Sequence, residues 1–182
     1  MKKIAVHLAE GFEEIEAVSI IDVLRRAGFD VKVVSLTGNN EVTGSHQIRI
    51  TSDILFENVD YTEIDMLVLP GGMPGAKNLK EHIGLAEQIV NFNDSGKPLG
   101  AICAAPLVLG NLGILKDIKA TCYPGFEGEL HDAIVTENDV ELAGSVVTGK
   151  GAGVAIDFAL KIVEMFKGKE EADELARKMI VN

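Results

Sequence analysis

The 182-residue sequence has no tryptophan, only two cysteines, and aromatic side chains at just 5% of its positions. Two cysteines, 19 positions apart, are too few for a disulfide framework and indicate a reduced, cytoplasmic setting. The shortage of aromatic rings disfavours stacking platforms for single-stranded nucleic acid. No apolar run approaches the roughly 18 residues that a membrane span requires. The segment that begins at Met1 carries no small-residue cleavage site, so no secretory signal is expected.

Positive charge is also scarce, because 17 Lys and Arg residues face 28 Asp and Glu residues and give a formal net charge of −11. Duplex nucleic acid and anionic membranes both attract clustered basic residues, so neither is an expected partner. With 47% hydrophobic and 25% charged residues the chain can bury a full core, which excludes disorder. We expect a single domain over residues 1–182 that serves as a small-molecule enzyme or a protein-interaction module.

Short apolar segments alternate with helical segments along the chain. Strands are predicted at 4–9, 31–36, 64–69, 97–102, 120–123, 133–136 and 145–148, and helices at 13–27, 84–95, 105–112, 154–166 and 169–179. Residues 41–51 have the pattern of an exposed hairpin. Strands that alternate with helices predict a doubly wound, mostly parallel α/β sheet with helices on both faces.

Ligands of such sheets bind beyond the carboxyl ends of the strands, at the strand-to-helix turns. Three of these turns carry unusual residues, at 10–16, 70–75 and 102–106. In the third turn, Cys103 stands between a buried strand and a helix, which is the position of a nucleophile elbow. The helix dipole is expected to lower the pKa of its thiol and raise the thiolate fraction. The alternative is a small buried hydrophobe, which is the interpretation favoured for Cys122 in a strand.

Glu16 in the first turn falls on the apolar arc of its predicted helix, in line with Ile20 and Val23. A carboxylate that faces the core is costly when ionised, so its pKa is expected to rise until the group is protonated near neutral pH. A protonated carboxyl can donate a hydrogen bond to a thiolate or shuttle a proton. The alternative is an acidic residue that the helix dipole favours in a first turn, which fits Glu13 and Glu14 well.

The second turn, Pro70-Gly71-Gly72, ends a strand with two residues that tolerate any backbone angle, so it either aims N–H groups at an oxyanion or is a plain tight turn.

No metal site is expected, because the four histidines are scattered and no HExxH or CxxC motif occurs. The glycine-rich segment 149–153 precedes a helix and could hold an anion, but it lacks the P-loop ending and the dinucleotide fingerprint, so no nucleotide is assigned to it.

Three motifs in order, at residues 11–17 (GFEEIEA), 69–72 (LPGG) and 101–106 (AICAAP), resemble the ThiJ/PfpI superfamily. The Gly-x-Glu-Glu-x-Glu run is similar to its DJ-1 branch, which contains the Parkinson-disease protein and bacterial YajL-like proteins. The resemblance covers nearly the whole chain and continues at residues 22–28, 151–153 and 157–160.

The resemblance implies a flavodoxin-like, class I glutamine-amidotransferase-like domain that forms homodimers and needs no cofactor. It implies that Cys103 is the nucleophile and an oxidation-sensitive thiol, with Glu16 as the protonated carboxyl hydrogen-bonded to it. The backbone N–H groups of Gly72 and Ala104 would form the oxyanion pocket.

The resemblance also implies an activity on 2-oxoaldehydes. Members are credited with cofactor-independent conversion of methylglyoxal to lactate (glyoxalase III-like, a lyase) and with deglycation of early glyoxal adducts on amines and thiols (a hydrolase). The alternative is a redox sensor or stress chaperone that signals oxidative stress through oxidation of Cys103.

Two positions depart from the family pattern. The protease-like branch places a histidine directly after the cysteine, where this chain has Ala104, so peptidase activity is not expected. The human protein has a histidine near its cysteine where this chain has Tyr123, which leaves Glu16 as the main proton carrier.

Overall fold

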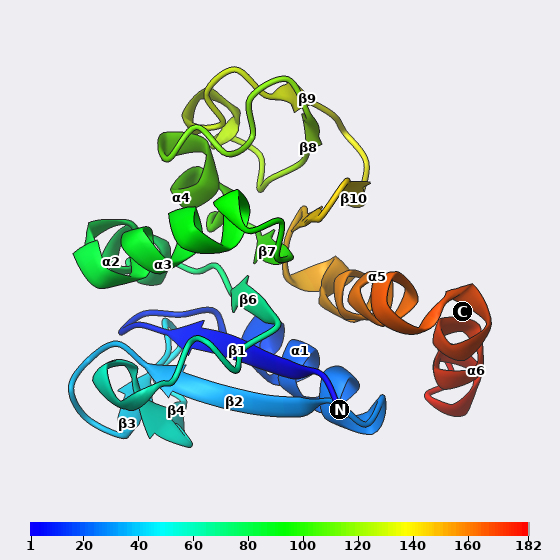
Figure 1. Ribbon diagram of the computed structural model, residues 1–182, viewed down its shortest axis with the longest axis horizontal. Helices are drawn as coiled ribbons and strands as arrows, with labels where there is room; N and C mark the ends of the chain where they lie inside the picture. Colours follow the sequence, from blue (N-terminus) through cyan, green and yellow to red (C-terminus); the bar gives the residue numbers. More distant parts are fainter. Residues whose placement is uncertain (182) are drawn as a thin grey trace.

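A computed structural model describes residues 1–181, in which seven strands form one sheet in the order β10-β11-β7-β6-β1-β2-β5 (Figure 1). These strands are β1 (Lys3–Leu8), β2 (Asp30–Ser35), β5 (Ile54–Leu55), β6 (Met66–Leu69), β7 (Leu99–Ile102), β10 (Val140–Ala143) and β11 (Val146–Gly149). Every neighbouring pair is parallel except β10 and β11. The predicted doubly wound, mostly parallel sheet is therefore confirmed.

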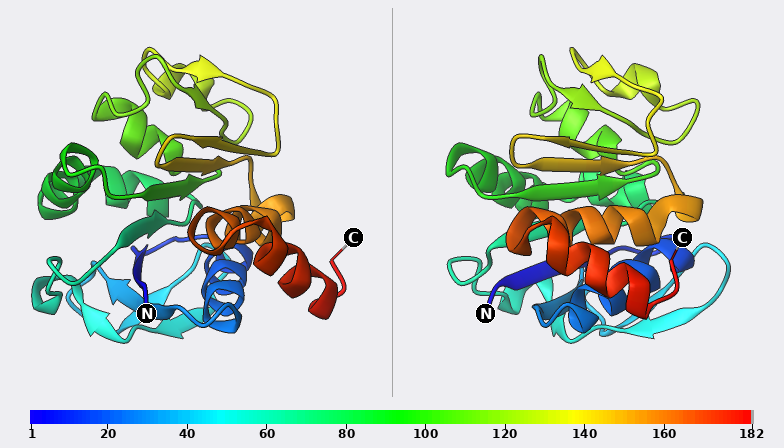
Figure 2. Two further views of the ribbon diagram at one scale, coloured as in Figure 1. Left: turned by 45° about the vertical axis from the view of Figure 1, so that its right-hand side comes forward. Right: turned by 90° about the vertical axis from the view of Figure 1, so that its right-hand side faces the viewer.

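Helices cover both faces of the sheet, as the two views of Figure 2 show. One face carries α1 (Glu14–Arg26), α5 (Ala155–Lys167) and α6 (Lys169–Lys178), and the other carries α2 (Gly75–Glu81), α3 (Ile83–Asp94) and α4 (Pro106–Asn111). Each face has its own cluster of buried apolar side chains between helices and strands. No helix of residues 1–181 combines the length and the apolar character that crossing a bilayer requires.

The predicted hairpin at 41–51 is confirmed as the antiparallel pair β3 (Glu41–Thr43) and β4 (Arg49–Thr51). The strands predicted at 120–123 and 133–136 are shorter, β8 (Lys119–Ala120) and β9 (Ile134–Val135), and they pair with each other outside the main sheet. Three short 3-10 helices complete the description: η1 (Phe56–Asn58), η2 (Glu127–Glu129) and η3 (Ala152–Val154). Helix α2 was not predicted, because its seven residues are too short to display a period.

Helix α1 shows how local sequence fixes an element that carries a site residue. It begins after Glu13, whose carboxylate caps it by accepting a hydrogen bond from the backbone N–H of Glu16 at 2.7 Å. Ile20 and Leu24 are fully buried, and burying a side chain of that size stabilises the fold by about 1.5–3 kcal/mol. The helix ends before Gly28, whose φ of +78° is a left-handed conformation that suits glycine. These features anchor the first turn of α1 against the core.

Strands β1 and β6 are neighbours, yet the chain leaves them toward opposite faces of the sheet. After β1 it passes into α1 on one face, and after β6 it passes into α2 on the other. Such a divergence leaves room beyond the carboxyl ends of the strands, where ligands of open α/β sheets bind. The three turns singled out in the sequence follow β1, β6 and β7, so they meet at this edge.

Candidate active site

Cys103 follows β7 directly and has a left-handed backbone, with φ of +63°. This conformation costs a non-glycine residue about 1–2 kcal/mol, so the surrounding structure must hold it. Its N–H donates to the carbonyl of Gly149 at 2.9 Å, and its carbonyl accepts from the N–H of Tyr123 at 2.8 Å. The sharp strand-to-helix turn predicted at this position is confirmed.

Glu16 lies in the first turn of α1 and is fully buried, which confirms its predicted inward direction. Its Oε2 accepts a hydrogen bond from the backbone N–H of Gly71 at 2.7 Å, whereas its Oε1 has no hydrogen-bond partner among residues 1–181. Burial raises the pKa of Glu16 to about 7, and the charge of Glu13 adds to that rise. Interactions with Cys103 and with the N–H of Gly71 act in the opposite direction.

The structure brings Glu16 and Cys103 side by side across Gly71. A Cβ added at Gly71 would lie 2.7 Å from the Cβ of Cys103 and 2.9 Å from Oε2 of Glu16. The backbone N–H groups of Gly72 and Ala104 face the same sulfur and lower the pKa of the thiol by hydrogen-bonding its charged form. All four residues named in the sequence for this site therefore converge on one place.

The expected low pKa of the Cys103 thiol is wrong. Burial raises this pKa to about 12, and the charge and hydrogen bonding of Glu16 add to the rise. The dipole of α4 lowers the pKa of the thiol only weakly, because this helix begins three residues after Cys103, at Pro106, and has six residues. Between these two pKa values, about 7 for Glu16 and about 12 for Cys103, the sulfur and the carboxyl together hold one proton. A thiolate forms when that proton passes from Cys103 to Glu16.

Gly71 is a part of the site that sequence reasoning did not single out by itself. Replacing it with alanine would place a Cβ 2.8 Å from the carbonyl oxygen of Ile102, in addition to its close approach to Cys103 and Glu16. We expect Gly71→Ala to lower the free energy of unfolding by about 1–3 kcal/mol, measured by urea denaturation. Gly128→Ala is the matched control, since its added Cβ meets nothing within 4 Å. Equal stability of the two variants would contradict the close packing.

Tyr123, noted in the sequence as a departure from the family, lies on the rim of the site and is half exposed. Its ring approaches the glycine-rich segment, because a Cβ at Gly151 would lie 3.3 Å from it. An open hollow beside the ring is lined by Tyr123, Lys150 and Val154. The second cysteine, Cys122, is buried, which agrees with the structural role predicted for it.

The sequence profile of the DJ-1/PfpI family matches residues 2–165 of this chain. Protein DJ-1 homolog B of Arabidopsis thaliana is 39% identical over 180 residues, which cover 98% of this chain but only 41% of the plant protein. The glutathione-independent glyoxalase DJR-1.2 of Caenorhabditis elegans is 33% identical over 170 residues, or 92% of this chain and 90% of that protein. The solved structure of oxidized DJ-1 from Toxoplasma gondii superposes with a TM-score of 0.95 at 37% identity and covers 99% of this chain and 98% of the other.

Proposed function

Because the chain belongs to the DJ-1/PfpI family, a family that includes glyoxalase-type enzymes, we propose that it is a cofactor-independent cysteine enzyme acting on 2-oxoaldehydes. The observation that carries the proposal is the contact between the Cys103 turn and the buried carboxyl of Glu16. A nucleophile needs a nearby base, and the buried Oε1 of Glu16, which has no hydrogen-bond partner among residues 1–181, supplies one. The relative named a glyoxalase, which is similar over nearly the full chain, supports methylglyoxal as the substrate to test.

In the proposed reaction, the sulfur of Cys103 adds to the aldehyde carbon of methylglyoxal while its proton passes to Glu16. The N–H groups of Gly72 and Ala104 stabilise the oxygen that becomes negative in the resulting hemithioacetal. Glu16 returns that proton to the oxyanion, which frees its carboxylate to take the proton of the former aldehyde carbon. It delivers this proton to the neighbouring carbonyl carbon while the hydroxyl proton passes to the neighbouring oxygen, so that the hemithioacetal becomes a thioester. Water hydrolyses the thioester to lactate and returns the thiol. One methylglyoxal and one water give one lactate, so no redox cofactor is needed.

The test is methylglyoxal consumption and lactate formation by the purified protein, in buffer free of glutathione and amines. The proposal expects saturable lactate production in a one-to-one ratio with the aldehyde consumed. A protein that neither consumes methylglyoxal nor forms lactate would overturn it. Deglycation of glyoxal adducts on amines and thiols uses the same nucleophile, and preformed adducts offered as substrate would reveal it.

A second candidate function is redox sensing at Cys103, and the solved Toxoplasma gondii relative, described as oxidized, favours it. Oxidation of the thiol to a sulfinate would place two oxygens near the carboxyl of Glu16 and the N–H groups of Gly72 and Ala104. A sensor that passes the signal to a partner, or a stress chaperone, needs little turnover. Oxidation of Cys103 at one equivalent of peroxide in a protein inert toward methylglyoxal would favour this function over the enzyme.

We also propose that the protein forms a homodimer through an apolar face at the start of α1 and the tip of the β3–β4 hairpin. Ile15, Val18 and Ile48 are 59%, 50% and 56% exposed there, and the backbone of Ile48 contacts the first turn of α1. A two-fold axis through such a face would bury it against its own copy. Val18→Asp is expected to convert the dimer to a monomer in sedimentation velocity, whereas Ile83→Asp, exposed on the other face of the sheet, should not. A monomeric wild-type protein would contradict the proposal.

A further inference from the structure

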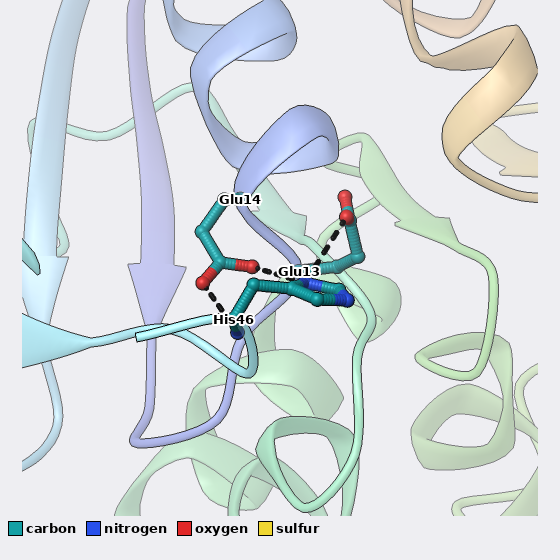
Figure 3. Close-up of side chains that lie close together, drawn as sticks. All are labelled: Glu13, Glu14 and His46. Carbon is teal, nitrogen blue, oxygen red and sulfur yellow. Dashed lines mark hydrogen bonds and ion pairs between the residues drawn. The ribbon is translucent and has the colours of Figure 1, made fainter. Parts of the chain in front are cut away.

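Two acidic residues at the start of α1 lie beside a histidine from the β3–β4 turn, as Figure 3 shows. Glu13 and Glu14 are 33 and 32 positions from His46, so no spacing in the sequence indicated the cluster. One carboxylate oxygen from each glutamate and one ring nitrogen of the histidine all lie within 4.8 Å of one another. The sequence predicted no metal site, and the fold creates this candidate by joining the hairpin to the helix.

Both carboxylates are held in place by one oxygen and present the other to the same atom of His46. Oε1 of Glu14 accepts from the backbone N–H groups of His46 at 2.6 Å and Ile48 at 3.4 Å, while Oε2 lies 2.9 Å from His46 Nδ1. Oε2 of Glu13 accepts from the N–H of Glu16, while Oε1 lies 3.9 Å from His46 Nδ1. Backbone donors that fix the far oxygen of a carboxylate are the kind of support that orients metal ligands.

The distances suit a small divalent ion after a modest adjustment. Bonds of about 2.0–2.2 Å in a tetrahedral zinc site place neighbouring ligand atoms about 3.3 Å apart. The two distances to His46 Nδ1, 2.9 and 3.9 Å, lie on either side of that value. The side chain of His46 is 72% exposed in the single chain, which leaves it room to adjust, whereas that of Glu14 is 5% exposed and is held by backbone N–H groups. Oγ of Ser45, 3.3 Å from Oε2 of Glu14, is a further oxygen at the same place.

A simple ion pair between Glu14 and His46 accounts for only part of this arrangement. Two carboxylates around one imidazole keep a negative charge even when the ring is protonated, and Glu13 brings the second of them. A divalent cation between the three groups would compensate that charge. One nitrogen with two carboxylate oxygens is a donor set for an ion of borderline softness, more than for Mg²⁺, which prefers oxygen alone.

We propose that Glu13, Glu14 and His46 form a binding site for a divalent transition-metal ion of the Zn²⁺ type. The site takes one ligand atom from each residue and lies on the face through which the homodimer is proposed to form, so each dimer would hold two ions at that interface. At least one coordination position would remain for water or Ser45.

The proposal is tested by calorimetric titration of the full-length protein with Zn²⁺. The titration uses a Cys103→Ala background, because the thiolate of Cys103 is itself a zinc ligand and would add a second binding event. We expect one ion per chain. His46→Gln and Glu13→Gln should each weaken binding at least about tenfold. Glutamine at position 13 keeps an oxygen that can accept the N–H of Glu16, so the start of α1 is preserved.

His131→Gln is the matched control, since that histidine is exposed and lies outside the cluster. It should bind Zn²⁺ with the affinity of the background protein. A background protein that does not bind Zn²⁺ saturably would overturn the proposal. So would binding that both His46→Gln and Glu13→Gln leave unchanged, because the ion would then lie elsewhere.

Discussion

The Cys103→Ala variant is expected to convert methylglyoxal to lactate at least about 10³-fold more slowly than the wild-type protein, because no other group at the site can form the covalent intermediate. Alanine has the same Cβ as cysteine and meets the same steric cost at φ of +63°, so the variant removes the sulfur and little else. The measurement is the initial rate of lactate formation at saturating methylglyoxal.

Cys122→Ala is the matched control for this prediction. Cys122 is buried but lies outside the group formed by Glu16, Gly71 and Cys103, so its loss should leave the rate of lactate formation nearly unchanged. A Cys103→Ala variant with the wild-type rate would show that any methylglyoxal consumption arises from surface groups. The proposed function would then fail.

The Glu16→Gln variant is expected to move the reactivity of Cys103 to higher pH and to abolish lactate formation. In the wild-type protein the pair loses one proton with the pKa of about 7 that burial gives Glu16. Above that pH the carboxylate can accept the thiol proton as the sulfur attacks. The amide of glutamine cannot, so the thiolate must form at the thiol's own pKa, which burial keeps above the ordinary value of 9.

The measurement is the rate of Cys103 alkylation by iodoacetamide between pH 5 and 10. The wild-type rate should level off above about pH 7, where Glu16 is ionised and accepts the thiol proton, whereas the rate of the variant should keep rising up to the pKa of its unassisted thiol. Glu10→Gln, an exposed change in the turn after β1, should keep the wild-type profile. A profile that shifts to lower pH in Glu16→Gln would show that the carboxylate only repels the thiolate and is not its base.

Periodicity predicted the parts of the fold and site that depend on one segment at a time. The inward direction of Glu16 follows from the apolar arc of its own helix, and the turn at Cys103 follows from a buried strand that runs into a proline-started helix. Both were confirmed. The parallel sheet could also be predicted, because strands separated by helices have few other ways to pair.

Features that depend on two distant segments could not be predicted from periodicity. The pKa of the Cys103 thiol depends on how deeply the fold buries it and on the charge of Glu16, 87 positions earlier, rather than on the helix that follows it. The fit of Gly71 between these two side chains depends on three strand ends meeting. His46 reaches Glu14 only because the hairpin folds over the start of α1.

The burial of Glu16 determines which substitutions at position 16 would be favoured if this chain were selected for heat resistance. In the unfolded chain this carboxyl ionises near its ordinary pKa of 4.5, whereas in the folded protein it ionises near 7. The folded state therefore loses stability as the pH rises between these values, by about 3 kcal/mol in all. A neutral residue of the same shape would avoid that loss. Laboratory evolution of this chain for heat resistance alone, at neutral or alkaline pH, would thus favour sequences without a carboxyl at position 16. Thermostable descendants would keep the fold and the cysteine but lack the base.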